Sequence, residues 1–103
     1  GRRNGKKNPV DLCALYNSKS YHNDRQRALF EKAFLAVGSP SPKEAKNMFD
    51  LYLESKSPSQ EFQTKVEGLI QTHSHILLIL YDTKDYYNDR QRALFEKAFL
   101  VIE

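Results

Sequence analysis

The sequence predicts an all-α protein, a bundle of short helices, and two observations support this prediction. Five segments carry the pattern that opens a helix, in which a capping Asn or Ser is followed three residues later by an acid or an amide. The apolar residues after these caps recur at helical spacing. The composition of the 103 residues, 40% hydrophobic and 28% charged, is typical of a soluble globular domain.

The predicted helices can be located from their capping residues. The five starts are Asn8-Pro9-Val10-Asp11, Asn23-Asp24-Arg25-Gln26, Ser41-Pro42-Lys43-Glu44, Ser57-Pro58-Ser59-Gln60 and Asn88-Asp89-Arg90-Gln91. Three of them place proline at the first helical position, where its missing N–H does no harm.

The apolar periodicity gives each later helix one buried face. The predicted faces are Ala45, Met48, Phe49, Tyr52 and Leu53 in the third helix, Phe62, Val66, Leu69 and Ile70 in the fourth, and Gln91, Leu94, Phe95, Ala98, Phe99 and Ile102 in the last. We expect Phe49, Phe62 and Phe95 to meet in one core. The segment HILLILY at 75–81 has no period, and because a lone strand would have no partner, a short buried helical turn is predicted there.

The segment NDRQRALFEKAFL occurs twice, at 23–35 and at 88–100. The repeat extends over 10–37 and 75–102, whereas 38–74 has no full copy. We therefore predict a basic disordered tail at 1–8, a partial helical unit at 9–37 and a complete unit at 41–103, with 38–43 as the joint. The partial unit lacks its first two helices, so its apolar face should pack on the complete unit or on a second chain. Leu35 and Leu100 lie away from the apolar stripe, and exposed leucines at a helix end suggest a contact with another helix, another domain or a partner.

The complete unit resembles the FF domain, a module of three helices with a short 3₁₀ turn before the last. The resemblance rests on KEAKNMFDLYL with Phe49 and Leu53, on Phe62 at the usual Trp position, on HILLILY in the 3₁₀ position and on DRQRALFEKAFL. A tetratricopeptide-like repeat is the second interpretation, because the caps are spaced for hairpins of about thirty-three residues. It ranks lower because bulky Gln26 and Arg27 stand where that family has small residues.

No catalytic constellation is evident, and neither an enzyme nor a cofactor is predicted. His73 and His75 flank Ser74 without an orienting third group, and they have no further metal ligand at a suitable spacing. Asp82, Asp85 and Asp89 do not fit a calcium loop. The single cysteine, Cys13, lies in an apolar stretch and is predicted to be buried. The longest apolar run is too short to cross a membrane.

The resemblance to the FF domain implies a protein-interaction module that binds acidic or phosphorylated segments, in transcription elongation or pre-mRNA splicing. An intracellular location, nuclear or cytoplasmic, is expected. The predicted contacts are basic residues: Lys56, Lys65, Arg90, Arg92 and Lys97. The plainest alternative is a solvated helix face with one ion pair between Arg92 and Glu96.

Two further functions remain open. A nucleic acid could contact the tail residues Arg2, Arg3, Lys6 and Lys7, with Tyr16, Tyr21, Tyr86 and Tyr87 as stacking rings. The chain could also be a spacer in a helical array.

Overall fold

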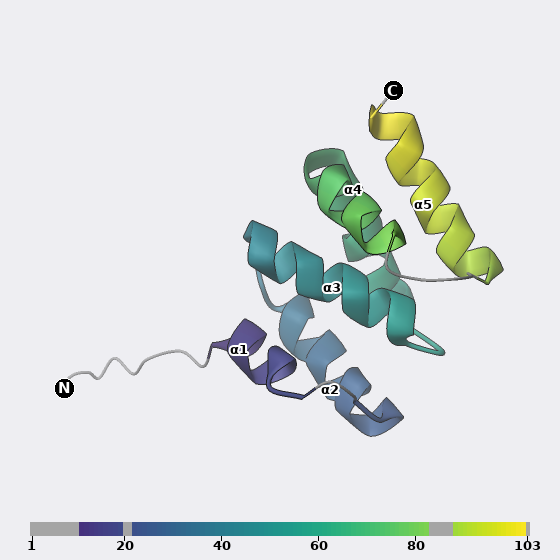
Figure 1. Ribbon diagram of the computed structural model, residues 1–103. Coiled ribbons are helices and arrows are strands. Elements are labelled where there is room, and N and C mark those ends of the chain that lie inside the picture. Colours follow the sequence, from purple (N-terminus) through teal and green to yellow (C-terminus); the bar gives the residue numbers. More distant parts are fainter. Residues whose placement is uncertain (1–10, 20–21, 83–87, 103) are drawn as a thin grey trace.

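The computed structural model is all-helical where it describes the chain, at residues 11–19, 22–82 and 88–102. Within these residues there are five helices and no strand, which confirms the predicted fold class (Figure 1). The helices are α1 (Leu12–Asn17), α2 (Asp24–Leu35), α3 (Pro42–Glu54), α4 (Gln60–Tyr81) and α5 (Asp89–Ile102).

Three helices begin where the capping pattern predicts. Asn23 and Ser41 each accept a hydrogen bond from the backbone N–H three residues later, and the side chain found there bonds back to the cap. Asn88 makes the same reciprocal pair with Gln91, at 2.8 and 2.9 Å. Pro42 stands in the first turn of α3, as predicted.

The two other starts were predicted too early. α1 is capped by Asp11, whose carboxylate accepts from the Ala14 N–H at 3.1 Å, and the predicted cap Asn8 lies outside the described residues. α4 is capped by Ser59, two residues after the predicted Ser57. Ser59 is held in an extended conformation because its own N–H donates to Glu31 of α2 while its hydroxyl accepts from the N–H of Phe62. A tertiary contact therefore decides where α4 starts.

The segment at 75–81 is helical, which confirms the choice of helix over strand, but it is α-helical and not the 3₁₀ turn that the resemblance to the FF domain implied. It is the second part of α4, which continues as an α-helix after a kink at His73, where φ is −131° and ψ is 27°. The prediction of a fully buried turn was wrong in one respect, because Ile79 on its outer side is exposed.

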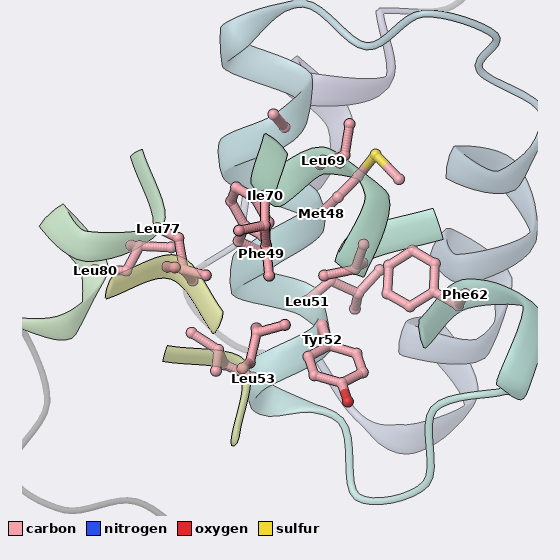
Figure 2. Packing of buried hydrophobic residues seen from close by; sticks show 14 of the residues in the cluster. Met48, Phe49, Leu51, Tyr52, Leu53, Phe62, Leu69, Ile70, Leu77 and Leu80 are labelled. Carbon is pink, nitrogen blue, oxygen red and sulfur yellow. The ribbon is translucent and has the colours of Figure 1, made fainter. Parts of the chain in front are cut away.

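α3 and α4 form a central hairpin with its apolar faces turned inward (Figure 2). The predicted faces of both helices are buried, and Phe49, Phe62 and Phe95 belong to one core. The core also contains Tyr16, Phe34, Ala45, Met48, Leu51, Tyr52, Leu53, Val66, Leu69, Ile70, Leu77, Leu80, Leu94 and Ala98. The prediction for α5 fails at its end, because Phe99 and Ile102 are about half exposed.

The two copies of the repeated helix lie on different sides of this hairpin. α5 packs against α4, whereas α1 and α2 pack against α3 and α4 from the other side (Figure 1). The partial unit thus packs on the complete one, but α2 buries Arg27, Glu31 and Phe34, and the predicted apolar face is not fully covered, since Leu29 stays exposed. Leu100 is exposed, as predicted. Leu35 packs against the core, in agreement with the expected contact with another part of the molecule.

Candidate protein-interaction site

Arg90, the first of the predicted contact residues, is used inside the fold. Its guanidinium donates to the carbonyl oxygens of Tyr52 at 3.0 Å and Ser55 at 2.6 Å, and it lies 4.7 Å from the centroid of the Tyr52 ring. The side-chain amide of the next residue, Gln91, donates to the carbonyl of Leu53 at 2.6 Å. Because the last carbonyls of a helix have no partner within it, Arg90 and Gln91 together cap the end of α3.

Three more predicted contact residues also bond within the chain. The Lys65 ammonium donates to the carbonyls of Leu35, at 3.2 Å, and of Val37, where α2 ends. Lys97 pairs with Glu67 of α4 at 3.2 Å. Arg92 pairs with Asp89 at 2.9 Å, and not with Glu96 as the spacing had suggested. Asp89 lies in the first turn of α5, where an acid also interacts well with the helix dipole.

Lys56 is exposed in the loop between α3 and α4, and among the described residues no hydrogen bond or ion pair holds it. It lines a polar cavity of about 220 Å³ together with Glu31 and Ser59. The five predicted residues therefore face different neighbours, and the structure does not gather them into one site.

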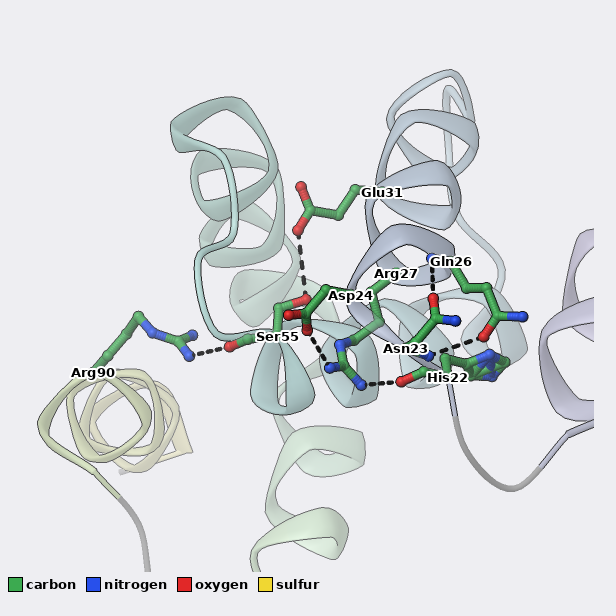
Figure 3. A network of polar contacts seen from close by, with 8 residues as sticks. All are labelled: His22, Asn23, Asp24, Gln26, Arg27, Glu31, Ser55 and Arg90. Carbon is green, nitrogen blue, oxygen red and sulfur yellow. Dashed lines mark hydrogen bonds and ion pairs between the residues drawn. The ribbon is translucent and has the colours of Figure 1, made fainter.

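The first copy of the repeat contributes buried charges to its contact with the hairpin (Figure 3). Glu31 accepts from the Ser59 N–H at 3.2 Å and from the Ser55 hydroxyl at 3.5 Å. Arg27 donates to the carbonyl of His22 and, at 2.6 Å, to the carboxylate of Asp24. Ser55 is shared by both copies, since its hydroxyl binds Glu31 and its carbonyl binds Arg90.

Tyr16 and His22 form the aromatic part of the same contact. Their rings are stacked with centroids 4.5 Å apart, and the Tyr16 hydroxyl donates to Asp50 at 3.0 Å. Burial, followed by the negative charge of Asp50, raises the pKa of Tyr16. Burial, followed by the positive charge of Arg27, lowers the pKa of His22. At neutral pH Tyr16 therefore keeps its proton, and its buried ring packs in the core and is not available as a stacking platform for a base.

A groove between α1 and α2 is the main apolar feature that sequence reasoning missed. It has a volume of about 280 Å³, and two of its lining residues, Leu12 and Phe30, also pack against the core. Its lining consists of Leu12, Leu15, Gln26, Leu29, Phe30 and Ala33. Leu29, at its rim, is 62% exposed although its twin in α5 is buried. The repeat indicated that the first copy lacks the two helices that cover this face in the second copy, but the prediction was that the face would be packed and not left open.

Two cations flank the groove. Arg25 lies four residues before Leu29 and Lys32 three residues after it, so all three share one side of α2. Arg25 and Lys32 are exposed, and within the described residues neither makes a hydrogen bond or an ion pair. They are the sequence twins of Arg90 and Lys97, which are engaged inside the fold.

Other sequence-based proposals have less support or lie elsewhere. In the described part of the chain no group of three or more His, Cys, Asp or Glu residues could hold a metal ion. No helix in that part is long and apolar enough to cross a membrane. Cys13 is buried, as predicted. The basic tail, Tyr21, Asp85, Tyr86 and Tyr87 lie outside the described residues.

Comparisons with family models, with curated proteins and with solved structures find no match to this chain.

Proposed function

We propose that the chain is a non-enzymatic protein-interaction module that binds an acidic segment of a partner protein in the groove between α1 and α2. The observation that carries the proposal is the pair of unengaged cations, Arg25 and Lys32, beside the open apolar lining around Leu29 and Phe30. Apolar side chains of the partner would gain from burial in the groove. Its carboxylates or phosphates would lie against the flanking cations.

The site differs from the one that the sequence alone suggested, but its chemistry is the same. Arg25 and Lys32 are the first-copy equivalents of Arg90 and Lys97. We therefore expect Arg25 and Lys32, in place of Arg90 and Lys97, to bind acidic or phosphorylated segments. An arginine can bind a phosphate through two parallel hydrogen bonds, whereas a lysine acts as a point charge. The resemblance to the FF domain supports partners in transcription or pre-mRNA splicing, and hence a role in the nucleus, as part of the proposal.

The proposal can be tested by fluorescence anisotropy with an amphipathic peptide whose apolar side is flanked by glutamates, with and without a phosphoserine. We expect Arg25→Glu and Lys32→Glu each to weaken binding by about tenfold or more, since reversal replaces an attraction by a repulsion. Added salt should weaken binding to the parent chain.

Arg92→Glu provides the matched control, because it makes the same charge change on α5, beyond the central hairpin from α2. Its exposed ion pair contributes little to stability, about 1 kcal/mol or less. The proposal fails if Arg92→Glu weakens peptide binding while Arg25→Glu does not. It also fails if a single-stranded oligonucleotide binds more tightly than either peptide and loses that affinity when residues 1–8 are deleted.

A further inference from the structure

The apolar groove on α1 and α2 has a buried counterpart in the second copy of the repeat. The five apolar residues of the groove, Leu12, Leu15, Leu29, Phe30 and Ala33, correspond to Leu77, Leu80, Leu94, Phe95 and Ala98. Each pair is the same amino acid. The five residues of the second copy are at most 7% exposed, whereas Leu15 and Leu29 in the first copy are more than half exposed. The second copy therefore shows what this face packs against when it is covered.

The covering element is the hairpin of α3 and the first part of α4. α5 makes its closest packing with α4, and the residues of its buried face belong to the same core as Phe49 and Phe62 of the hairpin. This chain's own hairpin covers the groove only in part, because Leu12 and Phe30 pack against the edge of the core while Leu15 and Leu29 stay exposed. The main contact of α2 with the hairpin uses a different side, on which Glu31 and Phe34 are buried.

The two copies also have the same internal shape. In the first, the rings of Tyr16 and Phe30 meet edge-on with centroids 5.1 Å apart, and in the second, Tyr81 and Phe95 do so at 5.0 Å. The next ring pair along the helix is also similar in the two copies. The ring centroids are 6.0 Å apart for Tyr16 and Phe34 and 5.5 Å apart for Tyr81 and Phe99. The ring contacts within α1 and α2 therefore resemble those within α5 and the end of α4.

The polar contacts around this face are repeated as well. In the second copy Arg90 and Gln91 cap the end of α3, and Lys97 pairs with Glu67 of α4. In the first copy the same letters occur as Arg25, Gln26 and Lys32. The backbone N–H of Asn23 donates to the Gln26 oxygen, as that of Asn88 does to Gln91, so the amide nitrogen is presented in the same way. A hairpin with exposed carbonyls at the end of its first helix and an acid on its second helix would satisfy all three side chains.

From these correspondences we infer that the groove is the docking site for a two-helix hairpin of the α3–α4 type, supplied by another copy of the repeat unit. This inference rests on the proposed function, since it uses the same face and narrows the class of partner. The order of the elements gives the connection. Residue 10 aligns with residue 75, so residues 38–74 joined directly to residue 10 would present a hairpin to α1 and α2 as this chain's own hairpin is presented to the second part of α4 and to α5.

The inference can be tested with an extended chain in which a second copy of residues 38–74 directly precedes residues 10–103. In the 103-residue chain, Leu29→Ala should change the unfolding equilibrium constant by less than about threefold, as expected for an exposed side chain. In the extended chain it should raise this constant by at least about thirtyfold, the effect of truncating a buried leucine. Leu94→Ala, which should have this larger effect in both chains, is the reference.

A labelling experiment gives a second measurement that does not depend on global stability. With Cys13→Ala as background, Leu29→Cys should react quickly with a thiol reagent in the 103-residue chain and at least about tenfold more slowly in the extended chain, since access controls the rate. Equal labelling rates, or a neutral Leu29→Ala in the extended chain, would overturn the inference.

Measuring peptide binding to the 103-residue chain shows whether a negative result contradicts hairpin docking or the proposed function. If residue 29 stays exposed in the extended chain while the acidic peptide binds the 103-residue chain, hairpin docking is wrong and the proposed function stands. If residue 29 becomes covered but no peptide binds, the general function is wrong and docking of a repeat unit stands.

Discussion

Arg27 and Glu31 are charged residues that lie buried between α2 and the hairpin, each 8% exposed. Burial of a charge is unfavourable unless hydrogen bonds replace the lost water. Glu31 receives such bonds from the start of α4, and Arg27 donates to Asp24 and to the carbonyl of His22. Their counterparts Arg92 and Glu96 are exposed on α5. The same letters thus serve as interface residues in one copy and as surface residues in the other.

His22 should make the stability of the chain depend on pH. Burial, and then the positive charges of Arg27 and Lys19, lower its pKa in the folded state, against a smaller opposite effect of Asp50. Below the ordinary histidine pKa of about 6.5 the unfolded chain therefore binds more protons at this site than the folded chain does. The stabilising effect of neutral His22 is present above that pH and is lost as the pH falls.

We expect the urea concentration at the midpoint of unfolding to decrease as the pH is lowered from about 7.5 to about 5.5. The decrease should be smaller for His22→Phe, which keeps an aromatic ring on Tyr16 but has no titrating group. His75→Gln, a change at an exposed histidine, should keep the parent slope. Parallel pH profiles for the parent chain and His22→Phe would show that His22 is not responsible.

At the scale of the helix, α2 and α5 show how far local sequence determines packing. They share twelve consecutive letters from 24–35 and 89–100, yet α2 buries Arg27, Glu31 and Phe34 while α5 buries Leu94, Phe95 and Ala98. A helix with apolar residues around much of its circumference can use either side. The neighbouring elements decide which one is covered.

The same substitution at the equivalent positions 34 and 99 measures how differently α2 and α5 bury this side of the helix. Phe34→Ala should destabilise the chain by about 3 to 5 kcal/mol, the effect of removing a fully buried ring. Phe99→Ala removes a ring that is 44% exposed and packs edge-on against Tyr81, so about 1 kcal/mol is expected. Urea denaturation followed by circular dichroism would measure both values. Equal losses would mean that α2 and α5 bury the same side in solution.

The same contrast separates what the sequence could predict from what it could not. The caps Asn23, Ser41 and Asn88 depend on bonds within one turn, and all three were predicted correctly. The start of α4 depends on Glu31, twenty-eight residues away from Ser59, and it was predicted two residues too early. The roles of Arg90 and Lys65 at helix ends were not predicted because the carbonyls that they bind belong to other helices. The exposed groove was missed for the same reason.

At the scale of the whole molecule, the α3–α4 hairpin is held from two sides, by α2 through Glu31 and by α5 through Arg90. Both contacts reach Ser55, the residue that ends α3. Because neither α1–α2 nor α5 has another partner for its buried face among the described residues, loss of the hairpin should release both. The chain is therefore expected to unfold in one cooperative transition, as most domains of this size do.

Cys13 offers a direct test of this cooperativity, because it is the single cysteine of the chain and lies buried in α1, on the side of the hairpin away from α5. Phe95→Ala should destabilise the α5 contact by about 3 to 5 kcal/mol, a large part of the roughly 5 to 15 kcal/mol of a typical domain. If the molecule is one unit, the variant should expose Cys13 to a thiol reagent at the urea concentration at which helical circular dichroism is lost. Leu100→Ala, at an exposed position of the same helix, should leave the labelling rate unchanged. A Cys13 that stays protected after α5 has melted would instead make α1–α2 and the hairpin a unit that folds without α5.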